Sequence, residues 1–214
     1  MSAILIFFIL VLNFGLSWWN AYAVGRVWAE TKAYGGFARL VAWSGAIMSA
    51  CGFTYVYVII LGVGFQAIAP FFLEPEQIAR LPRYTEAIFS LGYVMIILPV
   101  IGSGLIIAVH SWMVAWRERT FSSGTVATYN TLADVYNIYQ AVSYTPKALG
   151  NISGIFGGDD DDDNGLVAIV VILVLCAAIG GVVTTVIILR RAAKMSAREG
   201  SRKIRDLRQA EFVR

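Results

Sequence analysis

Four long stretches of this chain contain no charged residue, and charged segments separate them. Each stretch is longer than the roughly 20 residues that an α-helix needs to cross about 30 Å of hydrocarbon. No soluble fold requires four such segments, so the pattern predicts an all-α membrane protein with four transmembrane helices. The stretches are residues 1–25, 40–73, 87–116 and 164–189.

Composition and charge divide the chain into four parts. Of its 214 residues, 58% are hydrophobic and 14% are charged, which leaves too little polar surface to cover a soluble globule of this size. Nine of the seventeen Lys and Arg residues follow residue 189. We therefore expect three transmembrane helices with short loops in residues 1–116, an extracytoplasmic segment in 117–165, a fourth transmembrane helix in 166–189 and a basic cytoplasmic tail in 190–214.

The basic tail predicts the orientation, because positive residues beside a span stay in the cytoplasm during insertion. Four crossings then put the N-terminus and residues 74–86 in the cytoplasm and residues 117–163 outside. We expect a multi-pass protein of a prokaryotic or virus-encoded inner membrane. Basic residues near the first three spans oppose this orientation, but each group is smaller than the tail: Arg26, Lys32, Arg39, Arg117 and Arg119.

The first span has an alternative interpretation as a cleaved signal sequence. Its apolar run ends before Ala21, Tyr22 and Ala23, which fit the small-x-small cleavage pattern. No basic residue precedes the run, and the run continues into Trp18 and Trp19, which favours a retained helix. Removal of residues 1–23 would leave the orientation of the later segments unchanged.

Small residues at four-residue spacing predict the faces through which helices approach one another, because helix association in lipid depends on close packing and interhelical hydrogen bonds. Packing within the bundle and contact between copies of the chain both fit this pattern. On the fourth span we expect the bulky Val170, Leu173 and Val174 to lie on another face. The predicted packing residues are Gly45, Ser49, Ala177, Gly181 and Thr185.

A bend is predicted in the third span at Pro99, followed by Gly102 and Gly104. Proline removes a backbone hydrogen bond inside a helix, so the bend can serve either as a packing device or as a hinge.

Residues 124–146 carry apolar side chains at three- and four-residue spacing, which predicts an amphipathic helix outside the membrane. Its apolar face would lie on the membrane surface, on a partner helix or across the outer end of the bundle. The following run of five aspartates, residues 159–163, lacks the spacing of a calcium loop and is expected to be a solvated linker. The face comprises Tyr129, Leu132, Val135, Tyr136, Tyr139 and Val142.

The basic residues of the tail are candidate contacts for anionic lipid headgroups, since each is worth about 1 kcal/mol near a charged membrane surface. Docking of a cytoplasmic protein is the alternative, and nucleic acid is disfavoured because aromatic interleaving and a binding module are absent from the sequence. The residues concerned are Arg190, Arg191, Lys194, Arg198 and Arg202.

No residue pattern predicts catalysis, a cofactor or a metal. The four predicted spans contain no Asp, Glu, Lys or Arg, and the single histidine, His110, has no titratable neighbour in the sequence. Cys51 and Cys176 form no metal or redox motif. We therefore expect a non-catalytic integral membrane subunit that self-assembles or joins a larger envelope complex. A small pore is the alternative, since hydroxyl groups can line a water path, and a membrane enzyme is the least favoured class.

Overall fold

The computed structural model describes residues 3–31, 35–156 and 164–212, and these form five long α-helices and one 3-10 turn. Four of the helices, α1, α2, α3 and α5, are long and apolar enough to cross a membrane. This confirms the all-α class and the four predicted spans. The elements are α1 (Ala3–Thr31), α2 (Gly36–Ile68), η1 (Ala69–Phe71), α3 (Pro75–Glu118), α4 (Phe121–Phe156) and α5 (Asn164–Phe212).

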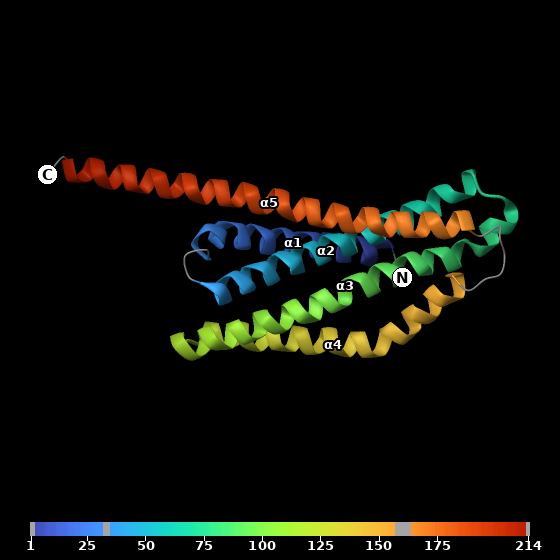
Figure 1. Ribbon diagram of the computed structural model, residues 1–214, viewed down its shortest axis with the longest axis horizontal. Coiled ribbons are helices and arrows are strands. Elements are labelled where there is room, and N and C mark those ends of the chain that lie inside the picture. The colour runs from blue at the N-terminus through green and yellow to red at the C-terminus, as the bar shows by residue number, and fades with distance from the viewer. Residues whose placement is uncertain (1–2, 32–34, 157–163, 213–214) are drawn as a thin grey trace.

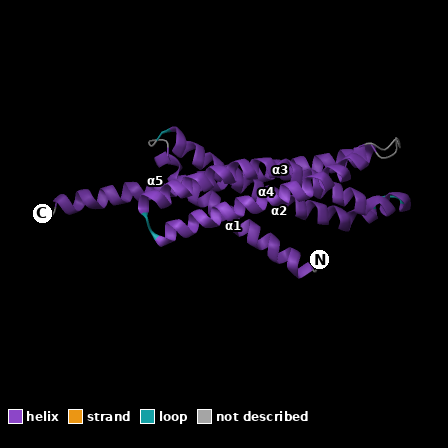
Figure 2. Cartoon of the chain, turned by 90° about the horizontal axis from the view of Figure 1, so that it is seen from below, coloured by secondary structure: helices purple, strands orange, loops and turns teal. Residues whose placement is uncertain are grey.

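The helices lie side by side, and their direction alternates along the chain (Figures 1 and 2). Helix α2 is central and packs against α1, α3 and α5, whereas α4 packs on the outer side of α3. The start of α1 and the tail of α5 lie toward opposite ends of the bundle. The C-terminal part of α5 continues beyond the other helices as a long extension.

The turn between α3 and α4 is sharp because both helix ends are capped locally. Arg119 adopts the left-handed conformation, with φ of 52°, and its N–H bonds to the Ala115 carbonyl at 2.9 Å. Thr120 then caps α4, since its Oγ1 accepts a hydrogen bond from the Ser123 N–H at 3.2 Å. Two residues thus reverse the chain and send α4 back along α3.

The path of α4 decides one of the arrangements expected for residues 117–165. This segment does not cover one end of the bundle, because α4 runs antiparallel to α3 from one end of it toward the other (Figure 1). Its 36 residues extend about 54 Å, more than the thickness of the hydrocarbon core. We infer that a bilayer crossed by α3 is also crossed by α4. The predicted acidic linker, residues 159–163, lies outside the described residues.

The helix ends are distributed over the two ends of the bundle. The turn between α2 and α3 lies at the end opposite to the α5 tail, so residues 74–86 begin at that opposite end (Figure 1). The end of α1, the start of α2 and the turn between α3 and α4 lie at the same end as the tail. Four of the basic residues that opposed the four-span orientation belong to these three places: Arg26, Arg39, Arg117 and Arg119. The fifth, Lys32, lies outside the described residues.

Close approaches of α2 to its neighbours occur at the predicted small residues. A Cβ added to Gly45 would lie 2.6 Å from Cγ2 of Val24 in α1. Beside it, Asn20 of α1 donates hydrogen bonds to the Gly45 carbonyl at 2.9 Å and to Ser49 Oγ at 3.0 Å. The Gly45 and Ser49 face therefore contacts α1 of the same chain.

The contact between α2 and α5 is equally close. A Cβ on Gly181 would lie 2.7 Å from the Ala50 carbonyl oxygen and would also collide with Thr54. Ala177 and Thr185 are buried on the same helix. Val170 and Val174 are fully buried as well, which corrects the expectation that they face elsewhere. They precede Ala177 and Gly181 by seven residues, about two helical turns, and therefore share their face.

We expect Gly181→Ala to destabilise the protein, because the new methyl group meets backbone atoms of α2, and overpacking typically costs about 1–3 kcal/mol. Gly64→Ala is the matched control, since nothing lies within 4 Å of a Cβ added there and alanine favours a helix over glycine by about 1 kcal/mol. Thermal unfolding in one detergent should give a lower Tm for Gly181→Ala alone. A similar Tm for the two variants would contradict this packing.

Candidate functional site: a polar seam between α3 and α4

Polar side chains gather where α3 and α4 face each other, and we call this strip the polar seam. Near the α3–α4 turn, Asn130 Nδ2 donates a hydrogen bond to Ser111 Oγ at 2.6 Å, and Trp112 Nε1 donates one to Thr131 Oγ1 at 2.9 Å. With increasing distance from the turn, the residues in contact have lower numbers on α3 and higher numbers on α4, because the two helices are antiparallel. The seam consists of Ser90, Tyr93, Gly104 and Ser111 from α3 and Asn130, Asp134, Tyr144 and Asn151 from α4.

The far part of the seam lies toward the α2–α3 turn. Tyr93 and Tyr144 meet edge to face, with ring centroids 4.8 Å apart. Asn151 Nδ2 donates a hydrogen bond to Ser90 Oγ, which is fully buried, at 3.1 Å. These groups pair the two helices across a second region, so polar contacts hold α4 to α3 along most of its length.

Asp134 is the carboxylic acid of the seam and lies against Gly104. Only 5% of its surface is exposed, and its Oδ1 forms no hydrogen bond among the described residues. A Cβ on Gly104 would collide with this carboxyl oxygen, so the glycine makes the notch that the carboxyl group occupies. Gly104 lies seven residues, or about 10 Å, from Ser111, which places the carboxyl well inside the bundle.

No family model, curated protein or solved structure matches this chain. A carboxyl group at membrane depth is costly, and ionisable residues in such places usually serve a function.

The outward side of α4 contrasts with the seam. All six residues of the predicted apolar face are exposed, with values from 56% for Val135 to 73% for Val142. Among these, Leu132 is 64% exposed, and it points away from α3 rather than into the bundle. The helix is thus amphipathic with its polar side inward, the arrangement expected where lipid or another helix covers the apolar side.

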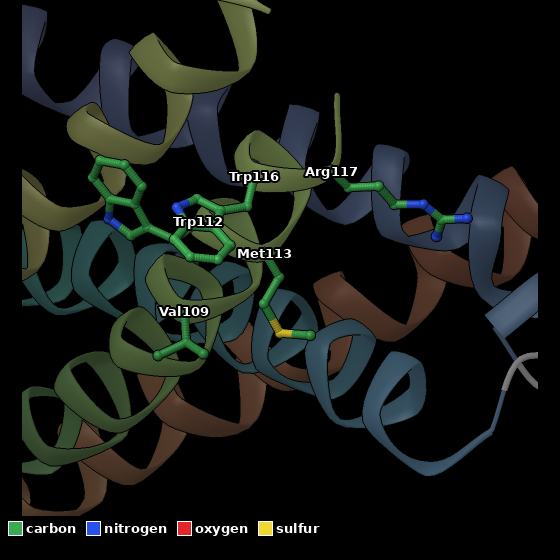
Figure 3. Close-up of a pocket in the computed structure, with 5 residues that line it drawn as sticks. All are labelled: Val109, Trp112, Met113, Trp116 and Arg117. Atoms are coloured by element: carbon green, nitrogen blue, oxygen red, sulfur yellow. The ribbon is translucent and has the colours of Figure 1, made fainter. Parts of the chain in front are cut away.

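Aromatic residues collect at the end of the bundle that carries the tail. Trp28 of α1 and Trp43 of α2 stack edge to face, with ring centroids 5.1 Å apart. Part of α3 lines an open hollow of about 680 Å³, where Trp116 is 83% exposed and Arg117 extends away from the rings (Figure 3). Tryptophan favours the headgroup level of a bilayer, so these rings mark one interface. The other lining residues are Val109, Trp112 and Met113.

The remaining predicted residues lie in separate places. Pro99 is inside the continuous helix α3, and Gly102 has open space around it. The basic residues Arg190, Arg191, Lys194 and Arg198 are exposed on α5. Near them Arg26 of α1 forms an ion pair with Glu199 at 2.7 Å, an exposed contact that adds little stability. Arg202 belongs to α5, and its side chain is not described.

The seam offers hydrogen bonds and one carboxyl group, but it lacks the constellation needed for metal binding. Within residues 3–31, 35–156 and 164–212, no three His, Cys, Asp or Glu side chains come together. Both cysteines are free, with Cys51 buried and Cys176 exposed. Asp134 was missed from the sequence because its segment was placed outside the membrane. Its signal was present, since it is the single charged residue between Arg119 and Lys147.

We expect Gly104→Ala to weaken the α3–α4 contact, because its methyl group displaces the Asp134 carboxyl from the notch. The typical cost of such overpacking is about 1–3 kcal/mol. Gly102→Ala, on the same helix but in open space, should keep or raise the stability. The check is the Tm of both variants in the same detergent. If Gly104→Ala is as stable as Gly102→Ala, the carboxyl does not occupy the notch.

Proposed function

We propose that this protein is a non-catalytic integral membrane subunit that assembles, through the outward side of α4, with another membrane-embedded helix. The favoured partner is a second copy of the chain, and a different protein of a larger envelope complex is the alternative. The observation that carries the proposal is an exposed apolar face that α3 leaves uncovered and that also carries the polar groups of Tyr136, Tyr139 and Gln140.

This face contains groups that are poorly suited to contact with hydrocarbon. Tyr136 and Tyr139 are 60% and 65% exposed, and Gln140 Nε2 donates a hydrogen bond to the Tyr136 hydroxyl at 2.8 Å. The Gln140 carbonyl oxygen accepts no hydrogen bond from the described residues. An unpaired amide group costs several kcal/mol in an apolar medium, so pairing with a neighbouring helix would stabilise this face.

We further propose that the C-terminus is cytoplasmic and that the tail binds anionic lipid headgroups. Arg26, Arg39, Arg117 and Arg119 belong to helix ends on the side of the tail, whereas the first turn of α3, at the other end, contains Glu76. Five crossings thus concentrate positive charge on one side, in agreement with the positive-inside rule. The exposed arginines of α5 can then reach the headgroups of the same leaflet.

A pore within one chain gains no support from the hydroxyl groups of the spans. Thr54 and Thr185 are buried in the contact between α2 and α5, where Thr184 also shares a hydrogen bond of 2.8 Å with Tyr57. Ser103 is buried on α3, and Ser44 bonds to the carbonyl of Leu40 in its own helix. Ser44, Thr184 and Thr185 thus use their hydroxyls in hydrogen bonds within the protein, which supports a structural role for them.

The assembly is tested by Tyr136→Leu combined with Gln140→Leu. If polar contacts cross the α4 face, their loss should reduce the association constant by about tenfold, since interhelical hydrogen bonds contribute about 0.6–1.7 kcal/mol each. Energy transfer between labelled copies in liposomes measures this constant for self-assembly. Affinity purification from native membranes, before and after the substitutions, measures loss of a stoichiometric partner of another kind.

The control is Ile172→Ala combined with Ile179→Ala, which removes side-chain bulk from an exposed part of α5. These changes should leave the association constant unaltered. The Tm of each protein shows whether the chain itself remains folded. Wild-type protein that is monomeric in lipid and purifies without a stoichiometric partner would contradict the proposal, as would undiminished assembly of the α4 variant.

A further inference from the structure

The Asp134 carboxyl group is enclosed by its own hairpin. Its side chain is 95% buried, and Oδ1 has neither solvent access nor a hydrogen-bond partner among the described residues. Gly104 forms the opposing wall, which is so close that an added methyl group would have to displace the carboxyl group. The oxygen is therefore closed off from water and from any side chain of another protein.

Among the residues that the structure describes, no opposite charge lies near this carboxyl group. Along α4 the nearest basic residue is Lys147, and along α3, measured from Gly104, it is Arg117, each 13 residues or about 20 Å away along the helix. The central helix α2 has no charged residue after Arg39. An ionised carboxylate in the notch would thus be an unpaired charge in a medium of low dielectric constant.

The remaining titratable groups of the seam are two tyrosines. Tyr93 and Tyr144 lie about ten residues farther along the two helices and face each other. His110 of α3 lies against Phe37 of α2, with ring centroids 6.2 Å apart, and so belongs to another contact. None of these groups supplies a positive charge beside Asp134.

Three occupants would neutralise Asp134: a proton, a metal cation or a basic side chain from a partner. A cation or a basic side chain would have to bind without Oδ1, which has no accessible surface, and within the described residues no three His, Cys, Asp or Glu side chains come together to complete a metal site. A proton needs no additional space. We propose that Asp134 is a proton-binding site within the membrane, and that its protonation holds α4 against α3.

Release of the proton separates the helices, because the resulting carboxylate is stable only in contact with water or a counter-ion. The other contacts of the seam are hydrogen bonds between neutral groups, such as Asn130 with Ser111 and Asn151 with Ser90. Such bonds are weak in membranes because each partner finds alternatives when the helices part. The proton on Asp134 thus controls the closure of the hairpin. This inference does not depend on the proposed assembly.

The first test is infrared spectroscopy of the full chain in liposomes, which detects the C=O stretch of a protonated carboxyl group. At neutral pH we expect this band in the wild type, and we expect Asp134→Asn to abolish it. Glu118→Gln, at the exposed end of α3, should leave the band unchanged. Absence of the band from the wild type at neutral pH would overturn the proposal, and sodium-dependent closure in its place would identify a cation site.

The second test measures closure directly, by electron paramagnetic resonance distances between spin labels. Labels replace Leu98 of α3 and Val142 of α4, which are 75% and 73% exposed, after the native cysteines have been replaced. Raising the pH should remove the infrared band and lengthen the distance together, whereas Asp134→Asn should keep the short distance throughout. Two results would contradict the coupling between deprotonation of Asp134 and separation of α3 from α4. One is loss of the band without a longer distance, and the other is a band that persists at every pH at which the protein is folded.

Discussion

Polar side chains inside a bilayer must find partners within the protein, and this constraint explains the position of α4. With Asp134, Asn130 and Asn151 on one side and exposed aliphatic and tyrosine side chains on the other, α4 would be poorly solvated alone in lipid. Helix α3 provides matching groups at Ser111 and Ser90 and a notch at Gly104. The pair therefore forms one unit, with its polar contacts enclosed and its apolar side outward.

The rest of the bundle depends on a different form of complementarity. Around α2, small residues allow backbones to approach closely, as at Gly181 against Ala50 and at Gly45 against Val24. Association there rests on close packing together with hydrogen bonds between uncharged groups, such as Asn20 with Ser49 and Tyr57 with Thr184. The two regions therefore respond differently to change. An added methyl group disturbs the α2 contacts by sterics, whereas the α3–α4 contact also responds to the protonation of one carboxyl group.

The helical class and four of the helices could be predicted from the sequence, because the apolar character of α1, α2, α3 and α5 is a property of each segment alone. Helix α4 could not be recognised in this way, since its polar residues become compatible with the membrane only when α3 is beside them. A partial signal existed in residues 120–146, where Asp134 is the single charged residue. The burial of Val174 was also predictable, because it lies two helical turns from Gly181.

The central claim is that α4 crosses the membrane, and cysteine accessibility tests it most directly. The experiment uses single cysteines in a chain whose native cysteines have been replaced. The first replaces Ser122, beside the α3–α4 turn, and the second replaces Ser201, on the α5 tail. The third replaces Glu76, beside the α2–α3 turn. All three positions are exposed. In intact cells, an impermeant thiol reagent should label the cysteine at 76 and leave those at 122 and 201 unlabelled until the membrane is opened. Labelling at 122 with protection at 201 would place these positions on opposite sides and contradict a membrane-crossing α4.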